Sequence, residues 1–217
     1  MPRTKSSQRW IARHVKDEYV KRAQKEGFRS RAAYKLAEID ARDHLFRAGL
    51  TVVDLGAAPG GWSQYAVKRV GPGGRVLAVD ILPMEPLQGV ELIQGDFTEA
   101  AVLNLVLERL QGRGVDLVIS DMAPNISGVA ASDQARSVYL AELALEFAAK
   151  TLRPGATLLV KTFQGEGFDA LRRQMRERFE KLATRKPKAS RAESREIYLL
   201  ARGFRGDRGC IESVAAS

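Results

Sequence analysis

Acidic residues stand at the ends of four predicted β-strands, where an α/β sheet binds its ligands. They are Asp54, Asp80, Asp96 and Asp121. A single strand-end aspartate is often a helix cap, but four in register indicate a ligand-binding edge, because ligands of such folds lie beyond the carboxyl ends of the strands. Asp80 follows a glycine turn by about twenty-five residues, close to the offset at which a carboxylate accepts ribose hydroxyls. Asp96 could accept a hydrogen bond from an adenine amino group.

The first of these acids lies in the stretch T-V-V-D-L-G-A-A-P-G-G-W, residues 51–62. Its composition predicts a buried strand, then a tight glycine turn, then a helix from Trp62 onward. A dinucleotide site would have G-x-G-x-x-G here, and Asp54 would repel its pyrophosphate. The same carboxylate would attract a ligand that carries an ammonium and a sulfonium, as S-adenosylmethionine does. We therefore predict that Asp54 and Gly56 belong to a site for this cofactor; the alternative is a structural glycine turn in another α/β protein.

Three charged residues are predicted to meet at the same edge of the sheet. Asp121 and Lys161 end the fourth and fifth predicted strands and should face the methyl group of the cofactor, and Glu196 begins the last strand. If that strand is antiparallel to its neighbours, its first residue lies where the other strands end. An ordinary charged rim is the alternative, and topology alone leaves both interpretations open.

The elements that must position these residues alternate along the chain. Strands are predicted at residues 51–55, 74–80, 90–93, 115–120, 156–160, 181–185 and 196–201. Helices are predicted at 9–24, 30–39, from 62, and at 98–110, 130–152 and 168–179, with Ser30 and Thr98 as N-caps. This order favours an α/β, Rossmann-like fold: a mostly parallel seven-stranded sheet with helices on both faces. Only about ten residues separate the last two strands, too few for a parallel crossover, so the last strand is predicted to be antiparallel.

The length of 217 residues suits one domain. We expect a single domain at 1–202, with basic N-terminal helices at 1–48 packed on it, and a disordered tail at 203–217. The single cysteine, Cys210, excludes an internal disulfide and a cysteine metal cluster and indicates a reducing, cytoplasmic environment. No apolar run approaches the roughly 20 residues of a membrane span, so we expect no contact with a membrane, and we expect no metal site.

A net charge of +9 indicates a polyanionic partner. The cations are densest in the two N-terminal helices, and the candidates for contact with RNA phosphates are Arg9, Arg13, Arg29 and Arg31. An aromatic side chain, Trp10 or Phe28, is available there to stack on a base. A solvated helical face is the alternative interpretation.

Six stretches match one protein family, in order and at fitting distances. They are R-S-R-A-A-Y-K-L (29–36), V-V-D-L-G-A-A-P-G-G-W-S-Q-Y (52–65), Q-G-D-F (94–97), S-D-M-A-P-N (120–125), V-K-T-F-Q-G-E-G-F (160–168) and S-R-A-E-S-R-E-I-Y (190–198). On these motifs the chain resembles the FtsJ-like methyltransferases over most of its length.

The resemblance implies a Lys-Asp-Lys-Glu catalytic set, which falls on Lys35, Asp121, Lys161 and Glu196. It also implies S-adenosylmethionine as the cofactor, bound by residues that include Gly60, Trp62, Asp80, Asp96 and Asp121. The implied reaction is methyl transfer to the 2′-oxygen of a specific uridine in 23S rRNA, within the assembled large (50S) ribosomal subunit, by a monomeric enzyme. The family's proton acceptor falls on Lys161. Since a lysine at its ordinary pKa of about 10.4 is mostly charged, acceptance of the proton and orientation of the oxygen both stay open as its role.

Other methyltransferase activities would require residues that this sequence lacks at the corresponding positions. A base methyltransferase that acts at carbon five uses a nucleophilic cysteine, whereas Cys210 lies outside every motif. An adenine-amino methyltransferase has an aromatic residue after the proline of the fourth-strand motif, where this chain has Asn125 after Pro124. An intact catalytic set argues against an RNA-binding factor without activity. The same reaction on another RNA, such as a tRNA, stays open because the catalytic motifs do not encode the choice of substrate.

Overall fold

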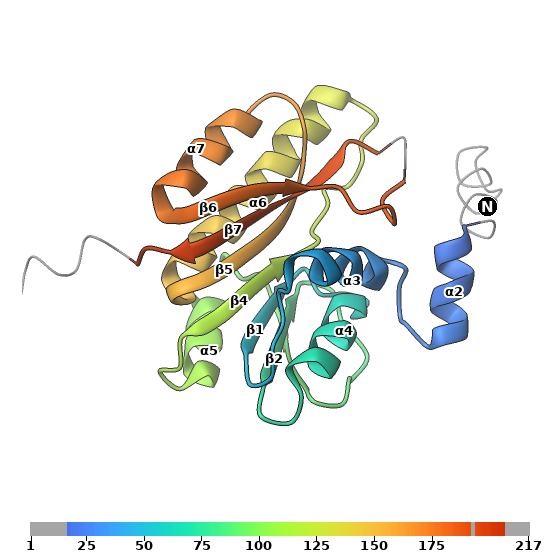
Figure 1. The fold of residues 1–217 in the computed structure, drawn as a ribbon. Helices are drawn as coiled ribbons and strands as arrows, with labels where there is room; N and C mark the ends of the chain where they lie inside the picture. Colours follow the sequence, from blue (N-terminus) through green and yellow to red (C-terminus); the bar gives the residue numbers. More distant parts are fainter. Residues whose placement is uncertain (1–16, 192–193, 207–217) are drawn as a thin grey trace, which may run out of the picture.

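A seven-stranded sheet forms the centre of the protein, with strand order β3-β2-β1-β4-β5-β7-β6 (Figure 1). The computed structural model describes residues 17–191 and 194–206. The strands are β1 (Thr51–Leu55), β2 (Arg75–Asp80), β3 (Val90–Gln94), β4 (Val115–Ser120), β5 (Leu152–Phe163), β6 (Phe179–Arg185) and β7 (Glu196–Phe204). Strands β1 to β5 pair in parallel, and β7 is antiparallel to both β5 and β6. The predicted fold class and the antiparallel last strand are confirmed.

Helices cover both faces of this sheet. The helices of the described residues are α2 (Glu18–Glu26), α3 (Ala32–Asp43), α4 (Gly61–Val70), α5 (Ala100–Leu110), α6 (Ala130–Thr151) and α7 (Phe168–Arg178), of which α2 packs beside α3 and not on the sheet. Helices α3 and α4 pack on one face, and α5, α6 and α7 on the other (Figure 1). Among the described residues, none of the helices has the length and apolar character needed to cross a membrane.

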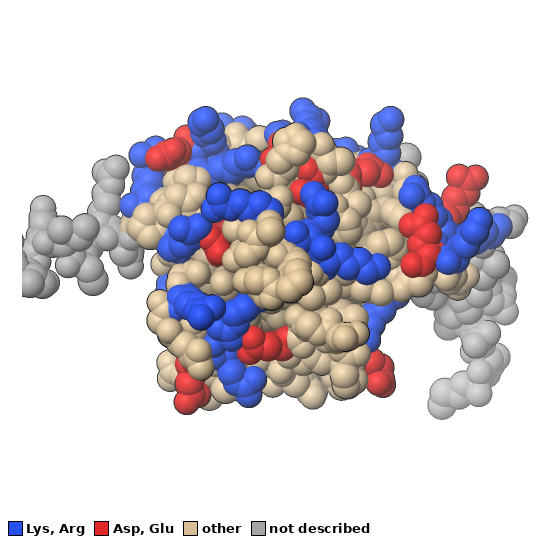
Figure 2. All heavy atoms as spheres, turned by 60° about the horizontal axis from the view of Figure 1, so that its bottom comes forward, with Lys and Arg blue, Asp and Glu red and all other residues tan. Residues whose placement is uncertain are grey.

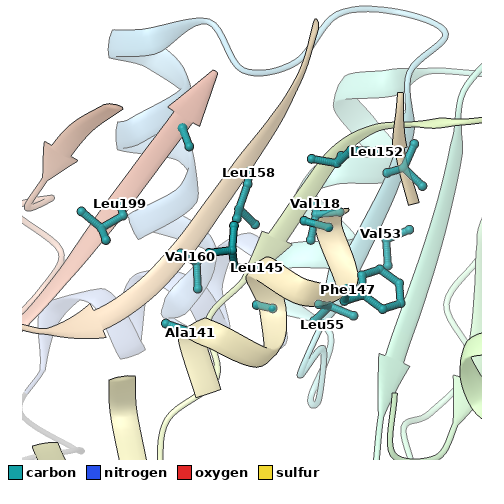
Figure 3. Close-up of a cluster of buried hydrophobic side chains, with 14 of the residues drawn as sticks. Val53, Leu55, Val118, Ala141, Leu145, Phe147, Leu152, Leu158, Val160 and Leu199 are labelled. Carbon is teal, nitrogen blue, oxygen red and sulfur yellow. The ribbon is translucent and has the colours of Figure 1, made fainter. Parts of the chain in front are cut away.

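Alternation along the strands builds a separate core on each face, because successive side chains of a strand point to opposite sides. In β5, Leu158 and Val160 pack towards α6, whereas Leu159 packs towards α3 and α4. Figure 3 shows the α6 side of this core, with Leu145 and Phe147 directed at the strands. The central strands are apolar on both sides, as expected of parallel strands that are covered on both faces.

Two predicted helix caps are wrong, because neither hydroxyl group bonds to the first turn of its helix. Helix α3 begins at Ala32 rather than at Ser30, whose side chain lies against Gly61 so closely that a Cβ there would come within 2.2 Å of the Ser30 hydroxyl oxygen. Helix α5 begins at Ala100, because the Thr98 hydroxyl donates to Asp96 at 2.7 Å.

Three predicted strands are too short by two residues or more. Strand β5 extends over Leu152–Phe163 instead of 156–160, β6 begins at Phe179 instead of 181, and β7 continues to Phe204 instead of 201. Residues 203 and 204 therefore belong to the sheet and not to the predicted tail. The physical reason is the Phe204 side chain, which is buried with its ring centroid 5.3 Å from that of Phe179. The rest of the predicted tail, from 207, lies outside the described residues, as do Arg9 and Arg13.

The carboxyl group of Asp54 lies inside the core of the fold. Asp54, near the end of β1, is 1% exposed and accepts a hydrogen bond of 2.6 Å from the Ser63 hydroxyl of α4. Burial, reinforced by the negative charges of Asp121 and Asp80, raises the pKa of Asp54 to about 7. The native protein therefore holds a proton on this group over a pH range in which the unfolded chain, with an aspartate pKa of about 3.9, has lost it.

We expect stability to fall as the pH rises from about 4 to 7, because the native state binds more protons than the unfolded state there, at up to roughly 1.4 kcal/mol per pH unit for this group. Asp54→Asn keeps an acceptor for Ser63 and removes the titration. Urea unfolding of both proteins at pH 5, 6, 7 and 8 measures the difference between their free energies of unfolding. The contributions of other titrating groups are common to both proteins and cancel in this difference. The protein should lose stability relative to the Asp54→Asn variant up to about pH 7 and then level off; parallel curves would contradict the assignment.

Candidate active site

A cleft of about 610 Å³ opens at the carboxyl ends of β1, β2, β3 and β4, within the range of about 300–1,000 Å³ usual for small-molecule sites. Four of its lining residues are Gly56, Asp80, Asp96 and Asp121. A smaller adjoining pocket of about 170 Å³ is lined by Asp54 and Trp62 and shares Gly56 and Asp121 with the cleft. These two spaces contain nearly all of the predicted cofactor residues, so the structure brings those residues together.

The glycine turn between β1 and α4 forms one wall of these spaces. Gly56 has a φ of 72°, and a Cβ at this position would come within 2.3 Å of the Met122 side chain. Gly60 has a φ of 105°, and a Cβ there would lie 2.9 Å from the Met84 sulfur. Both positions therefore require glycine for conformation and for space. The turn leads into the N-terminus of α4, whose free N–H groups can bind a carboxylate such as that of S-adenosylmethionine.

Two of the cleft carboxylates are already held by main-chain donors and keep acceptor capacity. Asp80 accepts from the N–H groups of Ala58 and Leu82, one on each oxygen and both at 2.8 Å. Asp96 accepts from the main chain and hydroxyl of Thr98 on the same oxygen, which leaves its second oxygen without a hydrogen bond from the described residues. Because each carboxylate oxygen has two lone pairs, both residues fit the predicted contacts with ribose hydroxyls and an adenine amino group.

Beside the cleft, four charged residues from four elements meet around Asp121. The Asp121 carboxylate lies 2.9 Å from the Lys161 ammonium of β5 and 3.9 Å from the Lys35 ammonium of α3. Lys35 in turn lies 2.8 Å from the carboxylate of Glu196 at the start of β7. The side chains are little exposed, at 6% for Lys161, 10% for Lys35, 12% for Glu196 and 17% for Asp121. The predicted convergence of these residues is therefore present in the structure.

Tyr198, to which the sequence motifs assigned no role, completes this group. Its hydroxyl donates to Asp121 at 2.7 Å, and its ring contacts Trp62 at a centroid distance of 5.7 Å. Burial and the charges of Asp121 and Glu196 raise the pKa of Tyr198 well above its ordinary value, so it stays a donor. The signal was available, because Tyr198 is two residues after Glu196 and a strand places both on one face.

The charges of the group determine the ionisation of Asp121. Burial alone would raise the pKa of Asp121, but the positive charges of Lys161 and Lys35, with hydrogen bonds from Tyr198 and Lys161, hold it below its ordinary value. Asp121 is therefore a carboxylate at neutral pH. Lys161 also donates to the main-chain carbonyl of Asp121, so its position is set by two acceptors on one residue.

Buried polar side chains of α6 hold the loops that follow Asp121 and Lys161. Asp133 accepts from the main-chain N–H groups of Ser127 at 2.8 Å and Gly128 at 3.2 Å, in the loop after β4. Gln134 donates to the carbonyl of Phe163 at 2.9 Å, and Ser137 accepts from the N–H of the same residue at 3.0 Å. Helix α6 therefore fixes the loop after β4 and the end of β5, next to Asp121 and Lys161.

Two of the arginines predicted to contact RNA have structural contacts. Arg29 donates to the main-chain carbonyls of Glu85 and Pro86, both at 2.7 Å, and to that of Pro59 at 3.4 Å, and so ties the loop after β2 to the glycine turn. Arg31 pairs with Asp17 at 2.7 Å. Their contact with RNA stays a prediction. Lys and Arg side chains nevertheless form several groups on the face shown in Figure 2, as the net charge of +9 requires.

Comparison with known proteins agrees with this geometry. The FtsJ-like methyltransferase family matches residues 28–204. A protein of Azoarcus sp. named ribosomal RNA large subunit methyltransferase E is 62% identical over 200 residues, which are 92% of this chain and 98% of the relative. A protein of the same name from Alkalilimnicola ehrlichii is 60% identical over 93% of this chain and 97% of the relative.

A solved structure of another methyltransferase has a similar fold. A Plasmodium falciparum protein described as a ribosomal RNA methyltransferase superimposes with a TM-score of 0.75 at 30% identity, over 82% of this chain and all of that chain. The family match covers the turn, the strand-end acids and the Lys-Asp-Lys-Glu set. The chain therefore belongs to the FtsJ-like methyltransferase family.

Proposed function

We propose that this methyltransferase moves a methyl group from S-adenosylmethionine to the ribose 2′-oxygen of a specific uridine in 23S rRNA. The observation that carries the proposal is the position of Asp121, which lines the cofactor cleft and is also the centre of the buried charged group. A reacting oxygen held by that group would therefore lie beside the cofactor. The names of the bacterial relatives supply the substrate, ribosomal RNA of the large subunit.

The bound cofactor supplies an electrophilic methyl group. The residues of the chain must position a poor nucleophile, a ribose hydroxyl, and deal with its proton. The ammonium groups of Lys35 and Lys161 can hold an oxygen that gains negative charge, and Asp121 and Glu196 keep the two ammonium groups in place. To accept the proton, Lys161 must first be uncharged; its two remaining N–H groups can then keep the contacts with Asp121 while its lone pair faces the hydroxyl.

We further propose that the substrate is the assembled large ribosomal subunit and that the enzyme acts in the cytoplasm as a monomer. The net charge of +9 and the single cysteine support this setting. The direct test is transfer of a labelled methyl group to purified large subunits that lack the modification, followed by mapping of the modified nucleotide. Labelling of free tRNA but not of the subunits would contradict the choice of substrate while leaving the chemistry intact.

Asp80→Ala should weaken the binding of S-adenosylmethionine by about tenfold or more. The variant has no charged acceptor for the ribose at this position, and hydrogen bonds to charged groups are worth about 1.5–3 kcal/mol each. Asp80→Asn keeps one acceptor oxygen, so its affinity for S-adenosylmethionine should lie between those of the unmodified protein and Asp80→Ala. Calorimetric titration with the cofactor measures the affinity, and binding to ribosomal subunits, which should not change, is the control. An unchanged cofactor affinity in Asp80→Ala would refute the assignment.

Lys161→Ala should lower the rate of methyl transfer by about a hundred- to ten-thousand-fold, the usual value of a positioned acid–base group. Cofactor affinity should be retained, since Lys161 is absent from the lining of the cleft. Lys161→Arg separates the two roles, because arginine keeps the charge but stays protonated. Substantial single-turnover activity in Lys161→Arg would favour stabilisation of the oxygen by charge over proton acceptance. Loss of activity in both variants calls for a pH–rate profile, in which a base gives a rising limb and a charge-stabilising lysine does not.

A further inference from the structure

A second hollow, of about 460 Å³, lies between the C-terminal half of α3 and the end of β6, apart from the cofactor cleft. Its lining residues are Glu38, Ile39, Ala41, Arg42, Arg185, Lys186, Pro187 and Lys188. We call this hollow the α3–β6 groove. Its floor includes the buried residues Ile39 and Pro187, and its rim carries four cations and one carboxylate.

The carboxylate and one of the cations are used within the fold. Glu38 accepts from the main-chain N–H groups of Lys188 at 2.5 Å and Ala189 at 3.0 Å. Arg185 makes two hydrogen bonds of 2.6 Å with Asp43. These contacts tie α3 to the segment between β6 and β7, so the walls of the groove are held in place.

The three remaining cations are exposed: Arg42, Lys186 and Lys188. Within the part of the chain that the structure describes, none of them forms an ion pair, although Lys186 donates to the carbonyl of Ser194 at 2.6 Å. A rim with three exposed positive charges above an apolar floor suits a ligand that has phosphates on one side and an apolar ring on the other.

Two elements that line the groove, α3 and β6, also lead to the catalytic group around Asp121. Glu38 follows Lys35 by one helical turn on α3, a rise of about 5 Å. Arg185 at the end of β6 is paired in register with Tyr198, whose hydroxyl contacts Asp121. A polynucleotide whose target ribose reaches Lys35 and Asp121 can therefore place a neighbouring nucleotide in the groove.

We propose that the α3–β6 groove binds the RNA strand next to the target nucleotide, with phosphates on Arg42, Lys186 and Lys188 and a sugar or base on Ile39 and Pro187. The proposal rests on the proposed function and names the path of its substrate. It extends the contact with RNA, which the charge pattern of the sequence placed on the N-terminal helices, from the C-terminal half of α3 to the segment between β6 and β7.

The test compares two sets of three charge removals. One variant carries Arg42→Ala, Lys186→Ala and Lys188→Ala. The control carries Lys150→Ala, Arg173→Ala and Arg176→Ala, which removes three exposed cations on α6 and α7 without an ion pair among the described residues. The probe is the large ribosomal subunit from cells that lack this methylation, and affinity is measured at several salt concentrations beside single-turnover methyl transfer.

The groove variant should bind the subunits at least tenfold more weakly at about 0.1 M salt. Its plot of log K against log salt should be flatter by about 0.7–0.9 for each phosphate that the variant no longer neutralises, or about two to three in all. The control should retain most of the affinity. In the groove variant, the rate of methyl transfer at saturating subunits and the affinity for S-adenosylmethionine should be unchanged. A triple variant that keeps the charges, with Arg42→Lys, Lys186→Arg and Lys188→Arg, should bind the subunits about as well as the unmodified protein.

Equal affinities and salt slopes for the groove variant and the unmodified protein would overturn the proposal. An equally weakened affinity in the groove variant and the control would also overturn it, since the effect would then be one of net charge. Failure of the unmodified protein to methylate the subunits would instead refute the proposed function, so the two failures are distinguishable.

Discussion

The structure depends on the balance of charge around Asp121. Two ammonium groups and two carboxylates share a mostly buried corner, and they come from α3, β4, β5 and β7. Removing one member of such a group leaves a buried charge without compensation, which typically costs about 3–5 kcal/mol. The four elements must therefore be held in one relative position. Helix α3, which carries Lys35, is anchored to the neighbouring α4 by a hydrogen bond of 2.8 Å from the Trp62 indole to the carbonyl of Ala32.

The cofactor cleft differs from the balanced group around Asp121, because acidic residues outnumber basic ones in its lining. Asp54, Asp80 and Asp121 are close enough that the latter two contribute to the raised pKa of Asp54. A ligand with positive charge would relieve this crowding and favour the ionised form of Asp54. The same carboxylates that reject a pyrophosphate thus prepare the cleft for a cationic ligand, and Tyr198 connects this region to the charged group by its contact with Asp121.

The sequence was sufficient for the sheet and its order of elements, because alternation and strand-end acids are local patterns with a fixed topological consequence. It placed Asp121, Lys161 and Glu196 at one edge of the sheet but left open whether they converge, which the side-chain contacts decide. Helix starts were not predictable in the same way. Ser30 and Thr98 have the right chemistry for caps, but their surroundings, the close approach of Gly61 and the carboxylate of Asp96, decide what they bind. Tertiary packing, which no local pattern contains, likewise extends β7 to Phe204 and engages Arg29 with the loop after β2.

The position of β7 has a consequence for the synthesis of the protein. Strands β5 and β6 are made before β7, yet they do not pair with each other, because β7 inserts between them. A growing chain that has not yet produced this strand lacks the centre of that part of the sheet, together with Glu196 and Tyr198. Its β5 would present an unpaired edge, the kind of surface that promotes aggregation. Completion of the sheet and assembly of the charged group therefore depend on the same strand, the last one to be synthesised.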